Sequence, residues 1–112
     1  MQFSEILGQE HIKNHLTQSA NLGRIPHAQL FVGPEGSGTL PMAIAYAQYI
    51  LCNNKDGENS GENQACNLKF QKLSHPDLHF AYPTVSTDSV KTKPKSIDFI
   101  TEWRAFITQN PY

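Results

Sequence analysis

The sequence predicts a three-layer α/β fold with a parallel sheet, and three consecutive features support this prediction. The apolar run at residues 28–32 has strand character and ends at Gly33. A glycine-rich turn follows at residues 33–38. Residues 39–52 carry no charge, so a helix there must be covered on most sides, as a helix packed on a sheet would be. A strand, a glycine turn and a buried helix in this order are typical of α/β proteins.

A first helix is expected before these features, at residues 9–21. Ile12, Leu16 and Ala20 recur at four-residue spacing, which places them on one face of a helix. Gly23 then supplies a C-terminal stop signal. The chain should therefore enter the first strand from an amphipathic helix through a short connector.

Two polar stretches, near residues 53–65 and 86–95, are expected to be flexible loops. Neither can bury enough apolar surface to offset the entropy lost on ordering it. Between them, residues 67–73 are predicted to form a short helix. The ordered structure of the domain should therefore be interrupted by two flexible loops.

The C-terminal third is predicted to hold a second strand and a last helix. Residues 77–82 lie between Pro76 and Pro83 and have the pattern of a strand. Ser96 can cap the last helix. The apolar face of that helix is formed by Ile97, Ile100, Trp103 and Ile107.

The bulk properties restrict the function classes. A chain of 112 residues suits one small domain, and a net charge of −1 provides no global field that would attract nucleic acid. Any DNA contact should be local or supplied by partners. No segment reads as a membrane span or a signal peptide, and Cys52 and Cys66 are too few for a disulfide scaffold. We expect a cytoplasmic protein that does not contact membranes, and the ending at Tyr112 suggests a piece of a longer chain.

The segment at residues 33–40 carries the most specific chemistry. A phosphate loop follows the pattern G-x-x-x-x-G-K-[ST], and Gly33 and Gly38 keep its glycine spacing. Thr39 stands where the lysine should reach the phosphates, and Leu40 stands where a hydroxyl should hold magnesium. Pro41 removes a backbone N–H from the first helical turn. We expect no ATP hydrolysis, and the glycines could equally form only a strand-to-helix turn.

Four segments resemble one family in one order. Residues 3–9 are similar to the "f-x-x-i-x-G-Q" entry segment of AAA+ clamp-loader ATPases, which lies near the adenine pocket. Residues 23–36 closely resemble the family's "G-R-[IL]-[PA]-H-A-x-L-F-x-G-P-x-G". Residues 75–78 resemble the "H-P-D" that follows the zinc module of the bacterial gamma and delta prime subunits. Residues 103–112 look like delta prime sequences of the Bacteroidetes type.

This resemblance implies a P-loop NTPase (AAA+) fold, here an incomplete N-terminal part spanning residues 1–112, without the rest of the core, the lid and the collar. It implies a scaffold subunit of the DNA polymerase III holoenzyme that does not hydrolyse ATP and that has no catalytic residue or metal ligand of its own. Binding of ATP or ADP is expected to be weak or absent. Any nucleotide would contact the degenerate phosphate loop through Gly33, Gly36, Gly38 and Thr39. The possible adenine side is formed by Ile6 and Leu7.

The resemblance also implies partners. These are the motor (gamma/tau) and delta subunits, with the sliding clamp and primed DNA reached through the assembled complex. An arginine finger for a neighbouring site would lie beyond Tyr112. The family's zinc module uses four cysteines, whereas this sequence has only Cys52 and Cys66, so we expect no zinc.

Two other interpretations of the phosphate loop remain open. The chain could belong to an active P-loop ATPase that tolerates an unusual loop, such as a motor subunit or a relative of Holliday-junction helicases. It could also bind nucleotide without hydrolysing it, through residues 6–8 and the amides of the glycine loop. The first interpretation differs from the scaffold hypothesis at Thr39, Leu40 and Pro41.

The remaining clusters favour structural interpretations. His11 and His15 lie one helical turn apart without an adjacent glutamate, which favours a solvated helix face. His75 and His79 have the same spacing, but Pro76 favours a turn at the entry to a strand. A metal held by the two cysteines and a histidine is the less favoured alternative. Three aromatic residues are predicted to be core rather than a stacking platform for bases: Phe99, Trp103 and Phe106. Three lysines are predicted to lie in a solvated loop rather than to contact phosphate: Lys91, Lys93 and Lys95.

Overall fold

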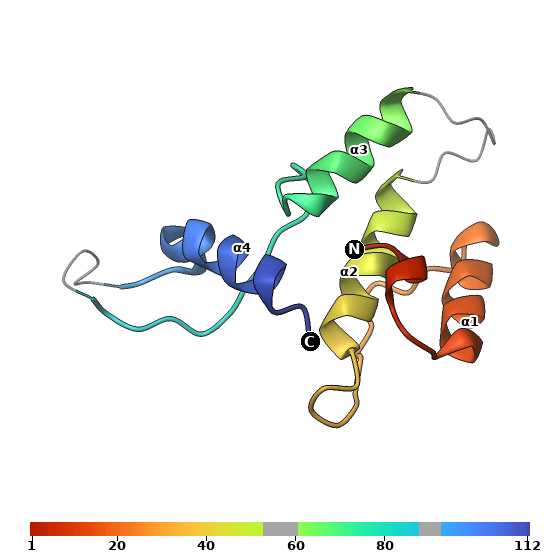
Figure 1. The fold of residues 1–112 in the computed structure, drawn as a ribbon, viewed down its shortest axis with the longest axis horizontal. Helices are drawn as coiled ribbons and strands as arrows, with labels where there is room; N and C mark the ends of the chain where they lie inside the picture. The colour runs from red at the N-terminus through yellow and green to blue at the C-terminus, as the bar shows by residue number, and fades with distance from the viewer. Residues whose placement is uncertain (53–60, 88–92) are drawn as a thin grey trace.

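The computed structural model describes residues 1–52, 61–87 and 93–112, and it is helical (Figure 1). In chain order the elements are the 3₁₀ turn η1 (Phe3–Glu5), the helices α1 (Glu10–Asn21), α2 (Thr39–Cys52) and α3 (Gly61–Gln71), the 3₁₀ turn η2 (Ser96–Phe99) and the helix α4 (Ile100–Gln109). None of the helices in the described ranges is long and apolar enough to cross a membrane.

Helix α2 is the centre of the molecule, with α1 on one side and α3 on the other (Figure 1). Half of its residues are buried, which is expected of a helix without a charged residue. Toward α1 and the N-terminal segment it builds a first apolar cluster, made of Ile6, Leu16, Met42, Ala45 and Tyr46.

A second apolar cluster joins α2 to the C-terminal half of the chain. It consists of Ile44, Cys52, Phe70, Leu73 and Ile107, and Trp103 packs against it. Polar contacts tie the same elements together, because Gln48 Nε2 donates to Asn67 Oδ1 at 2.9 Å and Arg104 Nε donates to the Leu73 carbonyl at 2.9 Å. The first bond joins α2 to α3, and the second joins α4 to the segment that follows α3.

The predicted α/β fold with a parallel sheet is wrong for the described ranges, which contain helices and no strand. Residues 28–32 are extended, but no backbone ladder pairs them, and Leu30 and Val32 are 88% and 81% exposed. In the second predicted strand, Asp77 lies in a turn and residues 78–82 have no strand assignment. An apolar run bounded by glycine or proline specifies extended backbone, whereas a strand also needs a partner backbone. Here α1 and α3, not a sheet, cover α2.

The helix predictions at residues 9–21 and 39–52 are confirmed. The short helix predicted at 67–73 belongs to the longer α3, which begins at Gly61, so the loop predicted near 53–65 is wrong from residue 61 onward. The remainder of that loop, and residues 88–92 of the second one, lie outside the described residues.

The cap predicted at Ser96 is wrong. The Ser96 hydroxyl instead exchanges two hydrogen bonds with the Tyr82 backbone, accepting from its N–H at 3.0 Å and donating to its carbonyl at 2.9 Å. Asp98 supplies the terminal contact by accepting from the Lys95 N–H at 2.9 Å. Of the predicted apolar face, Ile107 is buried and Ile97 is 68% exposed.

Candidate functional site

The glycine loop, residues 33–38, leads directly into α2. Its turn closes when the Ser37 N–H donates to the Pro34 carbonyl at 3.1 Å, and Gly36 takes the third position with a φ of 79°. A positive φ at that position is typical of a type II turn and favours glycine. The Met42 N–H then donates to the Gly38 carbonyl at 3.0 Å and begins the helix.

Two of these glycines also leave no room for a side chain. A Cβ atom on Gly33 would collide with Ser37 Oγ and lie 2.9 Å from Thr39 Cγ2. Gly38 has a φ of 86°, and a Cβ atom on it would lie 2.9 Å from Cε1 of Tyr112, whose ring covers this end of the loop. The glycine spacing noticed in the sequence therefore has a steric cause in the folded chain.

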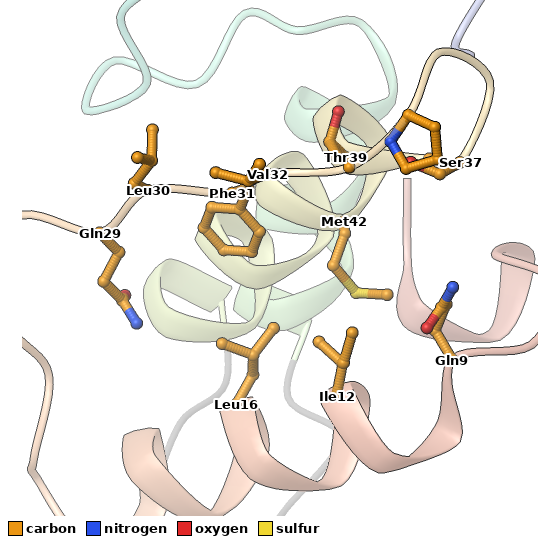
Figure 2. Close-up of a pocket in the computed structure, with 13 residues that line it drawn as sticks. Gln9, Ile12, Leu16, Gln29, Leu30, Phe31, Val32, Ser37, Thr39 and Met42 are labelled. Carbon is orange, nitrogen blue, oxygen red and sulfur yellow. The ribbon is translucent and has the colours of Figure 1, made fainter.

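A pocket of about 450 Å³ opens beside the loop (Figure 2). Ile12 and Leu16 of α1 point toward Phe31 and Met42 across it, and the loop closes one end. None of the residues that line the pocket carries a charge, and its polar side chains are Gln9, Gln29, Ser37 and Thr39. Backbone amides are thus the main source of positive potential for an anion here.

The structure brings only part of the predicted site together. Gly33, Gly38 and Thr39 line this pocket, whereas Gly36 lies on the exposed outer turn of the loop. Ile6 is buried in the first apolar cluster and Leu7 is 90% exposed, and both line a different pocket of about 470 Å³. The two halves of the predicted nucleotide site therefore do not share one pocket.

Lys13 is a buried cation that the sequence reasoning missed. Its Nζ donates to the Ile6 carbonyl at 2.6 Å and to Glu10 Oε1 at 3.0 Å, and the residue is 8% exposed. The Glu10–Lys13 spacing of one helical turn was the available signal. This lysine holds the N-terminal segment against α1 and lines the second pocket. It is not among the residues that line the pocket beside the glycine loop.

A cysteine–histidine cluster lies at the other end of α2. Cys52 and Cys66 form a disulfide, and a ring nitrogen of His75 and the two sulfurs lie within 4.8 Å of one another. The four-cysteine zinc site that the resemblance implies does not fit, because the whole chain has two cysteines and their sulfurs are bonded to each other. Two cysteines are too few for a disulfide scaffold, as predicted, but the sequence analysis did not anticipate this single bond.

An aromatic groove of about 300 Å³ lies between α4 and the extended segment before it. Tyr82 stacks on Trp103, with ring centroids 4.2 Å apart and 12° between the planes. Burial and the nearby Glu102 raise the pKa of Tyr82, against the opposing effect of Arg104. Phe106 is 58% exposed, so the prediction that it belongs to the core is wrong, while Trp103 does pack on the second apolar cluster.

The structural interpretations of the histidine pairs and of the lysine set can be compared with the described residues. His11 and His15 are both exposed on α1, as predicted. His75 and His79 lie outside helices, and the predicted turn is present because the Leu78 N–H donates to the His75 carbonyl at 3.1 Å. Lys93 and Lys95 are exposed, and Lys91 lies outside the described residues.

Comparisons with known proteins point to one group. A sequence profile described as "DNA polymerase III, delta subunit" matches residues 8–112. The delta' subunit of Bacillus subtilis DNA polymerase III is 29% identical over 94 residues, which is 84% of this chain and 27% of that protein. The gamma/tau subunit of Mycobacterium tuberculosis is 42% identical over 50 residues, and the tau subunit of Escherichia coli is 40% identical over 50 residues.

The chain therefore spans about a quarter of the length of the delta' relative and less than a tenth of the length of the gamma/tau relative. The gamma/tau and tau matches each cover 45% of this chain, whereas the delta' match covers 84% of it. No solved structure matches the chain.

Proposed function

The chain belongs to the family of DNA polymerase III delta subunits, and from this membership we propose that it works in a scaffold subunit of the delta prime type. In this proposal the full-length protein is a non-hydrolysing member of the bacterial clamp loader. It helps to place the sliding clamp on primed DNA during replication, in the cytoplasm, while other subunits hydrolyse ATP.

The observation that carries this proposal is a glycine loop that contains no basic residue. Transfer of the γ-phosphoryl group needs a cation and bound magnesium to stabilise the charge that develops. Thr39 and Leu40 supply neither, and no charged residue lines the adjacent pocket. The Ser37 amide is in addition engaged by the Pro34 carbonyl, so it is one fewer donor for a phosphate. This combination suits a subunit that kept the loop as a structural turn.

The coverage of the relatives supports the delta prime type over a motor subunit. The delta family profile spans residues 8–112, and the delta' relative aligns with 84% of the chain. The proposed partners are the gamma/tau motor and delta subunits. With a net charge of −1, the chain has no general attraction for DNA, so the clamp and primed DNA would be reached through the assembled complex.

Co-purification of the full-length protein with the gamma/tau subunit of its own organism tests the proposal. We expect a stoichiometric complex whose ATPase activity requires the phosphate-loop lysine of the motor subunit and is unaffected by Thr39→Ala in this protein. Absence of a complex between the two folded proteins would contradict the scaffold role. ATPase activity of the complex that persists after substitution of the phosphate-loop lysine in the motor subunit would contradict the proposal that this protein does not hydrolyse ATP.

A second candidate function is nucleotide binding without hydrolysis. The pocket of about 450 Å³ beside Gly33 and Gly38 favours it, as does the 42% identity to a gamma/tau subunit. Fluorescent ATP binding to the full-length protein is the test, with the double variant Thr39→Lys, Leu40→Thr beside the wild type. If the pocket accepts nucleotide, the double variant should bind about tenfold more tightly, because it regains the missing cation and hydroxyl. Equal, negligible binding by both proteins would exclude this candidate.

A further inference from the structure

The cysteine–histidine cluster brings together three reactive groups from distant parts of the sequence. Cys52 ends α2, Cys66 lies within α3, and His75 follows α3. The disulfide spans 14 residues of sequence, and the histidine nitrogen and both sulfurs lie within 4.8 Å of one another. A disulfide with an imidazole beside it has the components of a thiol–disulfide exchange site.

The two cysteine residues differ in how much of their surface is exposed to solvent. Cys52 is 7% exposed and belongs to the second apolar cluster, whereas Cys66 is partly exposed at the edge of that cluster. Exchange requires a thiolate to approach one sulfur from solvent. Because Cys66 is the more exposed of the two cysteines, we take its Sγ as the sulfur attacked and Cys52 Sγ as the leaving group.

Neighbouring groups fix the histidine in place. Its ring packs on the fully buried Phe70, with centroids 5.1 Å apart. Its Nδ1 accepts a hydrogen bond from the Asp77 N–H at 3.1 Å. In the neutral ring this bond leaves the proton on Nε2, so the imidazole can donate a hydrogen bond to a thiolate.

We propose that Cys52, Cys66 and His75 form a redox-active site that exchanges with a dithiol. A thiolate of the dithiol attacks Cys66 Sγ, the bond between the two cysteine sulfurs breaks, and Cys52 leaves as a thiolate that His75 stabilises by donating a hydrogen bond. The second thiol of the dithiol gives its proton to the Cys52 thiolate, attacks the mixed disulfide at the sulfur of the dithiol, and releases Cys66 as a thiolate. Two electrons pass to the cysteine pair, and the dithiol becomes a disulfide.

The state of this site controls how firmly α3 is held on α2. In the oxidised form the disulfide fixes the C-terminal residue of α2 to α3, beside the Gln48–Asn67 hydrogen bond. In the reduced form the noncovalent contacts of the second apolar cluster and this hydrogen bond remain. Reduction therefore loosens α3 without removing the packing of its Phe70 in the second apolar cluster.

Thiol–disulfide exchange of the full-length protein with dithiothreitol tests the site, with alkylation and mass measurement to count free thiols. The variant is His75→Gln, and the matched control is His79→Gln, an exposed histidine four residues further on. We expect His75→Gln to slow exchange about tenfold near neutral pH and much less at alkaline pH, where the thiolate forms without help. His79→Gln should exchange at the wild-type rate.

Two outcomes would overturn the proposal. One is an exchange rate that His75→Gln leaves unchanged at every pH, with the variant's circular dichroism spectrum matching that of the wild type. The other is tight, stoichiometric zinc binding by the reduced protein that prevents oxidised glutathione from re-forming the disulfide, since the cluster would then be a metal site. If the circular dichroism spectrum of His75→Gln differs from that of the wild type, the exchange rate is measured on His75→Asn instead, which has a shorter polar side chain. An unchanged rate in a folded His75→Asn variant would equally overturn the proposal.

Discussion

The two ends of α2 carry two different kinds of candidate site. The glycine loop precedes its first residue, Thr39, and offers a turn of the backbone with no basic side chain. The cysteine–histidine cluster begins at its last residue, Cys52, and offers three reactive side chains around a disulfide. The first end has the glycine spacing of a phosphate loop without its lysine and second hydroxyl, while the second end brings together reactive side chains that no short motif indicates.

The difference follows from how each end is built. The loop depends on local backbone conformation, so the six consecutive residues 33–38 define it. The cluster depends on the packing of α3 against α2, so residues separated by 14 positions must meet. Changes at one end should leave the other intact if this division is right.

The largest effect is expected at the cluster end, for Phe70→Ala. Phe70 is fully buried in the second apolar cluster and packs against the His75 ring, and truncation of such a side chain costs about 3–5 kcal/mol through the cavity it leaves. Urea denaturation measures the change, with the 54% exposed Leu68→Ala as the control. Equal losses for the two variants would mean that the second apolar cluster does not hold the cysteine–histidine cluster together.

Reduction of the disulfide is expected to have the next largest effect. Opening a loop of 14 residues should lower the free energy of unfolding by about 3 kcal/mol, because the reduced unfolded chain is less constrained. Urea denaturation with and without dithiothreitol gives the value. The double variant Cys52→Ala, Cys66→Ala should show no dependence on the reductant, and a wild-type protein equally insensitive to it would contradict the role of this bond.

A smaller effect is expected at the loop end, for Gly38→Ala. The positive φ and the close Tyr112 ring should together cost about 1–3 kcal/mol. Gly36→Ala is the matched control, because it has a similar φ of 79° but open space around its Cα. The double variant Gly38→Ala, Tyr112→Ala should recover the part of the loss that comes from the ring. If it recovers nothing, the ring does not cover the loop.

The smallest effect is a pH dependence at Tyr82. Burial and Glu102 raise its pKa above the ordinary value of about 10. The neutral phenol donates to the Ser96 carbonyl at 2.5 Å, so its contribution to stability is complete below pH 10 and is lost as pH rises through the raised pKa. Unfolding experiments at alkaline pH should show a steeper loss for the wild type than for Tyr82→Phe. Parallel losses would contradict this assignment.

Sequence reasoning predicted the helices that have a local signal and failed where a partner decides the outcome. The spacing of Ile12 and Leu16 and the absence of charge over residues 39–52 were sufficient for α1 and α2. The sheet was wrong because extended, apolar residues 28–32 do not reveal whether another backbone pairs with them. For the same reason Ser96 was taken for a cap, although its hydroxyl bonds the distant Tyr82 backbone.

The candidate site divides in the same way. The missing lysine and hydroxyl at Thr39 and Leu40 are visible in the sequence because the motif is contiguous. The separation of Ile6 and Leu7 from the loop pocket was not visible, since it depends on how the N-terminal segment packs on Lys13 and α2. The position of His75 beside the two cysteines was not visible either, because it depends on the path that the chain takes after α3.

The most direct test of the central claim is release of phosphate from ATP by the purified full-length protein, measured alone and with magnesium. The account predicts no release above the protein-free blank and no change in the Gly38→Ala variant, because the loop has no cation for the developing charge. Magnesium-dependent turnover that Gly38→Ala abolishes would contradict it and would identify the chain as part of an active ATPase.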